Sequence, residues 1–142
     1  NHPRIVNLHH IYEDDDYVYL IMDYIKGGEL LKRIDFLDEF SEYELRLLMK
    51  NLFDIVKYIH TKGIIHRDIK LDNILLKSEE TLSDIVLADF GLATFLTQTK
   101  NVYKRCGTPG FVAPEIINYK EGKPFYNEKA DVFSCGIVMH IL

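Results

Sequence analysis

Apolar residues recur at helical spacing through the middle of the chain. Between residues 45 and 59 they stand three or four positions apart, at Leu45, Leu48, Met49, Leu52, Ile55, Val56 and Ile59. This spacing places them on one face of an amphipathic helix. Ser41 followed by Glu44 is a capping box, which opens a helix, and Gly63 is typical of the position just beyond a helix end. The pattern predicts a long helix between Ser41 and Gly63.

Two segments near the start of the chain have the composition of strands. Residues 7–13 (NLHHIYE) and 17–24 (YVYLIMDY) are rich in β-branched and aromatic residues, and the acidic triplet 14–16 separates them. This arrangement predicts an antiparallel hairpin, and we interpret the triplet as a solvated turn rather than a metal site. The glycine pair 27–28 then ends the strand pattern before a short helix.

The second half of the chain alternates short apolar segments with a long irregular one. Residues 73–76 (NILL) and 84–90 (DIVLADF) are short and apolar enough to be buried strands. Residues 91–114 show little periodicity and predict a long loop, which is usually functional when ordered. The last stretch, 128–142, is apolar on nearly every side from Val132 onward and predicts a buried helix. Because the chain stops inside this run, we expect the sequence to be part of a longer protein.

Composition narrows the class of protein. The chain has 142 residues, 47% of them hydrophobic and 27% charged, which is ordinary for a globular domain. Its net charge of −5 gives no broad basic face, so we expect no nucleic-acid partner. No apolar run reaches the length of a membrane span, so we expect no membrane partner. Two cysteines are too few for a disulfide framework, so we expect an intracellular, cytoplasmic location.

One polar stretch stands out between two apolar runs. Residues 64–76 read IIHRDIKLDNILL, and six polar side chains are crowded within them. Burying charge is costly unless each group has a partner. Two interpretations of this stretch are open, a structural ion-pair network and a catalytic loop held between two short strands.

Three motifs resemble those of the eukaryotic protein kinases. HRDIKLDN at residues 66–73, DFG at 89–91 and APE at 113–115 occur in the same order as in that family. Each triplet alone is weak, but the ordered set is specific, and the resemblance covers essentially the whole chain. The segments GTPGFVAPE and KADVFSCG are similar to those of calcium/calmodulin-dependent serine/threonine kinases.

The resemblance implies a fold and a division of the chain. The fold would be of the α+β class, a protein-kinase-like fold present in part. Residues 1–25 would form the last strands of the N-terminal lobe and the hinge. Residues 26–142 would form the C-terminal lobe through its central helix.

The resemblance also implies a catalytic apparatus for ATP and Mg²⁺. Asp68 would be the catalytic base that orients the substrate hydroxyl, and Lys70 would neutralise charge on the transferred phosphoryl group. Asn73 and Asp89 would be the Mg²⁺ ligands, since this cation takes a few protein oxygens and shares the rest with phosphates and water.

Four residues are implied at the nucleotide. Met22 matches the gatekeeper position, and Asp23 and Ile25 would offer backbone groups to the purine edge. Leu75 would close the adenine pocket from below. From the sequence alone ordinary core is the alternative for all four residues, and for Met22 it is the stronger interpretation.

The remaining assignments concern the substrate and the support of the loop. Glu29, Asp72 and Thr108 would lie along the peptide substrate. For Glu29, a carboxylate that merely favours a helix N-terminus is the alternative. His66 would hold the loop by packing and hydrogen bonding, with Phe90 close to its ring.

A departure from the family concerns regulation. Arg67 precedes the base, as in kinases whose arginine grips a phosphate on the later loop. Many relatives carry a phosphorylatable threonine two residues before the cysteine of CGTPG, but here that position is Lys104. Thr99 or Tyr103 could take the phosphate instead, or none is needed.

The function implied is transfer of the ATP γ-phosphate to serine or threonine in protein substrates. The family's glycine-rich loop and ATP-binding lysine would lie upstream, so we expect the 142 residues alone to be inactive. A regulatory domain or partner outside this chain is also expected. A pseudokinase-like binding scaffold is the alternative. A sugar or small-molecule kinase is disfavoured, because APE and GTPGFV resemble a platform for an extended peptide.

Overall fold

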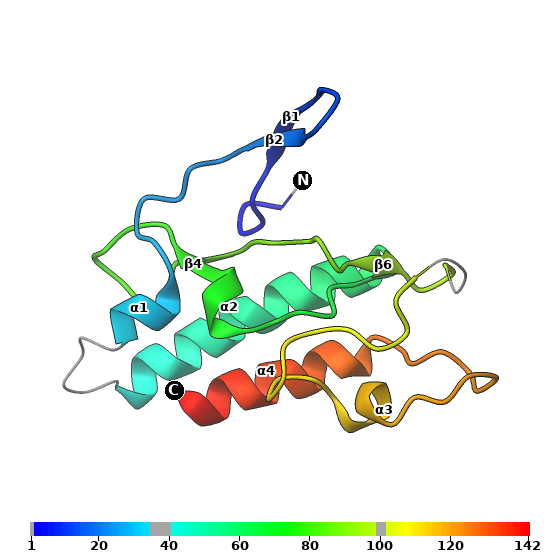
Figure 1. Ribbon diagram of the computed structural model, residues 1–142. Helices are drawn as coiled ribbons and strands as arrows, with labels where there is room; N and C mark the ends of the chain where they lie inside the picture. Colours follow the sequence, from blue (N-terminus) through cyan, green and yellow to red (C-terminus); the bar gives the residue numbers. More distant parts are fainter. Residues whose placement is uncertain (1, 35–40, 99–101) are drawn as a thin grey trace.

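The structure is a computed structural model that describes residues 2–34, 41–98 and 102–142. Figure 1 shows a long helix with a second helix beside it, and a hairpin that projects from the other elements. The helical elements are α1 (Leu30–Ile34), α2 (Glu42–Thr61), the 3-10 turn η1 (Leu71–Asn73), α3 (Pro114–Ile117) and α4 (Lys129–Ile141). The strands are β1 (Leu8–Glu13), β2 (Val18–Met22), β3 (Ile64–Ile65), β4 (Ile74–Leu76), β5 (Ile85–Leu87) and β6 (Thr94–Phe95).

The predicted hairpin is confirmed. Strands β1 and β2 pair antiparallel, with an irregularity in register between Leu8 and His10. The acidic triplet is the turn: the Asp14 carboxylate accepts the backbone N–H groups of Asp16 and Tyr17 at 2.9 and 2.8 Å. These bonds are those of an Asx-type turn, in which a side chain satisfies backbone donors that the strands leave unpaired.

The predicted long helix is confirmed as α2. The Ser41 hydroxyl accepts from the backbone N–H of Glu44 and donates to its carboxylate, at 3.2 and 2.6 Å, so both residues of the capping box are engaged. Gly63, just beyond the C-terminal cap, has a φ of 71°, which glycine adopts at little cost. The buried face consists of Leu48, Met49, Leu52, Ile55, Val56 and Ile59.

The predicted last helix is present as α4, but it is not buried on every side. It packs against α2, and its Cys135 and Val138 share a core cluster with the buried residues of α2. The buried residues of α4 are Ala130, Asp131, Ser134, Cys135 and Val138. Other apolar side chains on it are 40–52% exposed, namely Val132, Phe133, Met139 and Ile141. The expectation of burial all round was wrong for the described chain, because α2 covers only one side of α4.

No helix in the described ranges is long and apolar enough to span a membrane.

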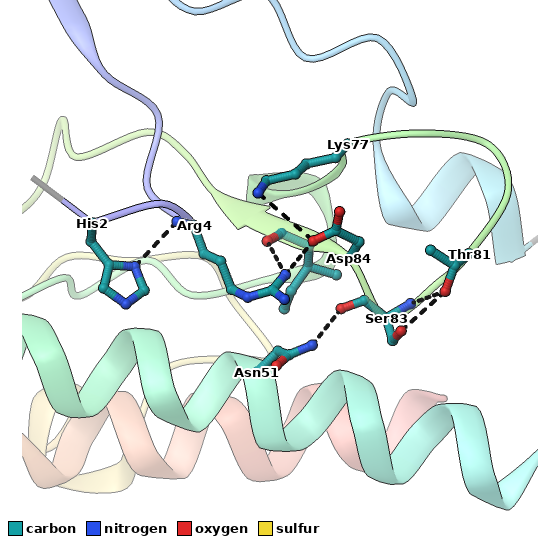
Figure 2. A network of polar contacts seen from close by, with 8 residues as sticks. His2, Arg4, Asn51, Lys77, Thr81, Ser83 and Asp84 are labelled. Carbon is teal, nitrogen blue, oxygen red and sulfur yellow. Dashed lines mark hydrogen bonds and ion pairs between the residues drawn. The ribbon is translucent and has the colours of Figure 1, made fainter.

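Short strands join the start of the chain to its middle. The two apolar runs form strands β4 and β5, as predicted, and these strands pair antiparallel. Leu87 in β5 also exchanges backbone hydrogen bonds with the chain at Arg4 and Val6. Figure 2 shows the polar side of this junction, where the Arg4 guanidinium contacts the Asp84 carboxylate. Nearby, the side-chain amide of Asn51 on α2 donates to the Ser83 carbonyl at 2.7 Å.

The glycine pair after the hairpin allows a close backbone approach. A Cβ on Gly27 would lie 2.4 Å from the carbonyl oxygen of Leu76, so only glycine fits there without a shift. The backbone N–H of Leu76 donates to the carbonyl oxygen of Gly28 at 2.8 Å. The segment that leads from β2 to α1 is thereby held against β4, next to the polar stretch singled out by the sequence.

Candidate active site

The polar stretch forms a loop between two short strands, as predicted. It leaves β3 at Ile65 and enters β4 at Ile74. Arg67 has a φ of 71°, a conformation that a non-glycine residue adopts only where the surroundings enforce it. The loop is therefore held in shape by specific contacts rather than by local preference.

Those contacts come from Asp131 on α4. Its fully buried carboxylate accepts the backbone N–H groups of His66 and Arg67 at 2.9 and 2.8 Å, and it lies 2.8 Å from Nε2 of His60. Sequence reasoning missed this residue. The available signal was a lone acidic residue in an apolar helical run, because a buried carboxylate needs several donors.

His66 has the supporting role predicted for it. Its buried ring lies 4.7 Å from Phe90, edge to face, and its Nε2 lies 3.1 Å from the Ala88 carbonyl. The backbone N–H of Asp68 donates to Nδ1 at 3.3 Å. Burial lowers the pKa of this histidine. The neutral ring with the proton on Nε2 satisfies both contacts. His66 therefore fixes the loop to the Ala88 carbonyl by its side chain.

Four predicted residues, Asp68, Lys70, Asn73 and Thr108, form a hydrogen-bonded cluster that we call the mouth of the loop. The Thr108 hydroxyl donates to one oxygen of Asp68 at 2.6 Å and accepts from the Lys70 ammonium at 3.0 Å. The ammonium also lies 3.5 Å from the second Asp68 oxygen, and the Asn73 amide nitrogen donates to that oxygen at 3.2 Å. The Asp68 side chain is only 10% exposed. A carboxylate, an ammonium and a hydroxyl are thus held within hydrogen-bonding reach of one another.

Asn73 and Asp89 lie at the same end of the β4–β5 pair. Asn73 directly precedes β4, and its carbonyl accepts from the Ala88 N–H at 2.9 Å, one residue before Asp89. Asp89 is exposed, with a φ of 55°, and its carboxylate accepts from the Gly91 N–H at 3.0 Å. The Asn73 amide nitrogen is committed to Asp68, which leaves the amide oxygen for a ligand. This pair of oxygen donors fits a hard cation such as Mg²⁺.

The residues expected around the nucleotide are only partly brought together. Met22, at the end of β2, is half exposed, and Leu75 is half buried in β4. The backbone N–H of Asp23 donates to the Asn7 carbonyl at 3.0 Å. Of the backbone groups of Asp23, only its own carbonyl therefore remains for a purine. Asp23 and Ile25 line a surface pocket of which neither Met22 nor Leu75 forms part.

The two expected carboxylates of the peptide groove lie on different elements. Glu29 stands just before α1, and its carboxylate pairs with the Lys32 ammonium at 2.7 Å. Asp72 is exposed on η1. Of the two residues expected to carry a phosphate, Tyr103 is exposed, and Thr99 lies outside the described residues.

The sequence profile of the protein kinase domain matches residues 1–142. This chain belongs to the protein kinase family. The α+β arrangement of the structure agrees with a protein kinase domain present in part, which confirms the predicted fold class.

Curated relatives of this kinase-family chain include calcium-regulated kinases. It is 39% identical to calcium-dependent protein kinase 5 of Plasmodium berghei over its whole length, which is 24% of that protein. It is 37% identical to myosin light chain kinase A of Dictyostelium discoideum, again over its whole length and 47% of that protein. Calcium/calmodulin-dependent protein kinase type 1 of Macrobrachium nipponense is 38% identical over 99% of the chain and 39% of the relative. The chain spans roughly a quarter to a half of these proteins.

Proposed function

We propose that the protein containing this chain transfers the γ-phosphate of ATP to serine or threonine hydroxyl groups of protein substrates. The observation that carries the proposal is the cluster of Asp68, Lys70 and Thr108 at the mouth of the loop. Membership of the protein kinase family and the names of the relatives support it.

In this proposal Asp68 orients the substrate hydroxyl and accepts its proton. Thr108 holds one carboxylate oxygen, which leaves the second oxygen beside the Lys70 ammonium. The ammonium stabilises negative charge on the phosphoryl group, and positioning with charge neutralisation is most of what this reaction needs. Asn73 and Asp89 would hold Mg²⁺, which when bound neutralises phosphate charge.

The 142 residues by themselves are proposed to transfer phosphate at a negligible rate. The glycine-rich motif GxGxxG that covers ATP phosphates in this family does not occur in them. A binding scaffold without catalysis is the second candidate. The observation that bears on it is the Asp23 N–H, which is bonded within the chain, so Asp23 can offer only its carbonyl to a purine.

The test is phosphate transfer to serine and threonine peptides by the longest natural protein that contains this chain. We expect Asp68→Asn to abolish transfer while nucleotide affinity stays nearly unchanged, and Asp89→Asn to weaken binding of magnesium-ATP. Asp54→Asn, on the exposed side of α2, is the matched control. Nucleotide binding without any transfer by the unmodified protein would favour the scaffold. Equal loss of nucleotide binding in both site variants would contradict the separate roles.

Peptide preference provides a second test of the substrate assignments. We propose that the protein selects a basic residue on the N-terminal side of the target, because Glu29 and Asp72 are carboxylates able to bind an arginine. A positional-scanning peptide library measures this directly. Selection for acidic residues before the target, or for tyrosine as acceptor, would rule it out.

A further inference from the structure

Arg67 joins the two ends of the long loop. Its side chain is buried, and its Nε donates to the Leu92 carbonyl at 2.6 Å. A terminal guanidinium nitrogen donates to the Tyr103 carbonyl at 2.7 Å. Leu92 follows the DFG motif directly, whereas Tyr103 precedes the GTPG segment. These two donors of the guanidinium are therefore occupied by backbone of the loop itself.

The same guanidinium nitrogen has a neutral partner on its other side. It donates to the hydroxyl of Tyr126 at 3.2 Å. Tyr126 is buried, and burial raises the pKa of its hydroxyl to about 12, so it remains uncharged at neutral pH. A hydroxyl of the chain, rather than an anion, meets the arginine here.

Lys104 contacts the aromatic residues next to Tyr126. Its ammonium lies 5.2 Å from the ring centre of Phe125 and 5.9 Å from that of Tyr119. Phe125 in turn stacks on Tyr126 with ring centres 4.2 Å apart. A cation over aromatic faces is attracted by their electron density. The ammonium therefore ties the end of the loop to the segment that carries the partner of Arg67.

Arg105 strengthens this attachment from the next position. Its Nε and one terminal nitrogen donate to the Tyr119 carbonyl at 3.1 and 2.7 Å. Two successive cations thus fix residues 104–105 to residues 119–125. A phosphate at position 104 would instead bring up to two negative charges to the faces of the aromatic rings.

We propose that Lys104 takes the place of an activating phosphate, so that the loop is held in its working arrangement without being phosphorylated. The inference rests on the proposed kinase function and adds its regulation. Lys104 acts through the loop and does not touch the reacting groups, so it is a positioning residue.

The activity test uses the longest natural protein that contains this chain, treated with phosphatase and checked by mass spectrometry. We expect its transfer rate to equal that of protein preincubated with ATP. Lys104→Met keeps the apolar stem but removes the charge, and it is expected to lower kcat/KM for the peptide about two- to thirtyfold. Lys104→Arg should restore the rate, because a guanidinium also binds aromatic faces. Lys120→Met, at an exposed lysine of the same segment, is the control and should leave the rate unchanged.

A second measurement does not depend on activity. Hydrogen exchange of residues 102–108 in the unphosphorylated protein should be about two- to thirtyfold faster in Lys104→Met than in the unmodified protein or Lys120→Met. Equal exchange in all three would overturn the role of Lys104. So would a rate that falls on phosphatase treatment and returns with phosphate on the loop. If no sample transfers phosphate, the proposed kinase function fails, and the exchange experiment still decides the role of Lys104.

Discussion

Two aspartates make the same number of polar contacts, but the partners of one are local in sequence and those of the other are distant. Asp14 in the hairpin turn accepts two backbone N–H groups and one side-chain hydroxyl, all within five residues. Asp131 on α4 accepts two backbone N–H groups and contacts one histidine, but its partners lie 64–71 residues away. Asp14 is exposed and Asp131 is fully buried. The hairpin closes on itself, whereas the loop between β3 and β4 is held in shape by a distant helix.

This difference separates local order from the order of the site. A carboxylate in water loses little when a partner is removed, because water replaces the donor. A buried carboxylate that binds backbone donors leaves those donors unsatisfied when it is lost. The hairpin is therefore expected to tolerate change that the loop between β3 and β4 does not.

The largest effect is expected for Asp131→Asn. The two carboxylate oxygens of Asp131 now accept two backbone N–H groups and contact His60. Asparagine replaces one of these oxygens by an NH₂ group, which is a donor and cannot accept. We expect a loss of about 1–3 kcal/mol in the free energy of unfolding for each buried donor that is left without an acceptor. Urea denaturation followed by circular dichroism measures it. A loss no greater than that of Asp14→Asn would erase the contrast between the two regions.

The hairpin and α2 could be predicted from sequence because their determinants are local. Alternating strand residues, the acidic turn and the Ser41–Glu44 capping box all act within a few positions. The loop between β3 and β4 was located through its motifs, and the strands on both sides of it followed from apolar runs. Their positions relative to one another depend on packing, which a local pattern does not encode.

The residues that sequence reasoning misjudged depend on distant partners. Asp131 was missed because its donors lie 64 or more residues earlier in the chain. The exposure of Val132 and Phe133 was not foreseen, because apolar composition predicts burial without saying what covers each side. The use of the Asp23 N–H by Asn7 likewise depends on strand register, which composition does not fix.

A smaller effect, on activity rather than folding, is expected for Thr108→Val. Valine has nearly the same shape but cannot donate to Asp68 or accept from Lys70. A hydrogen bond to a charged group contributes about 1.5–3 kcal/mol, so we expect kcat to fall about ten- to a hundredfold. The midpoint of thermal unfolding, measured alongside, shows how much of the loss falls on folding. Thr108→Ser keeps the hydroxyl and serves as the control, and equal loss in both variants would argue against a role for the hydroxyl.

Acid should destabilise the loop between β3 and β4 at a higher pH than it affects the hairpin. Burial lowers the pKa of His66 in the folded protein, so the unfolded chain binds its proton first as the pH falls. Stability from the neutral ring is therefore fully present above the ordinary pKa of about 6.5 and is lost as the pH falls below it. Denaturation midpoints between pH 8 and 5 should show this slope, and His66→Gln should reduce it. An unchanged slope in His66→Gln would assign the effect to other groups.

The smallest effect is expected for Asp14→Asn, which sharpens the comparison from the exposed side. Asparagine also accepts backbone N–H groups in turns of this kind, so the hairpin should keep its register. The pKa of Asp14 is lowered, chiefly by the Tyr19 hydroxyl and then by the two backbone N–H groups. Its contribution to stability is thus present above the ordinary aspartate pKa and is lost only as the pH falls through the lowered value. A small gap between the midpoints of the variant and the unmodified protein is therefore expected at pH 7, and this gap should close in strong acid. A gap at pH 7 as large as that of Asp131→Asn would show that the hairpin, despite its exposure, is tied to the rest of the fold.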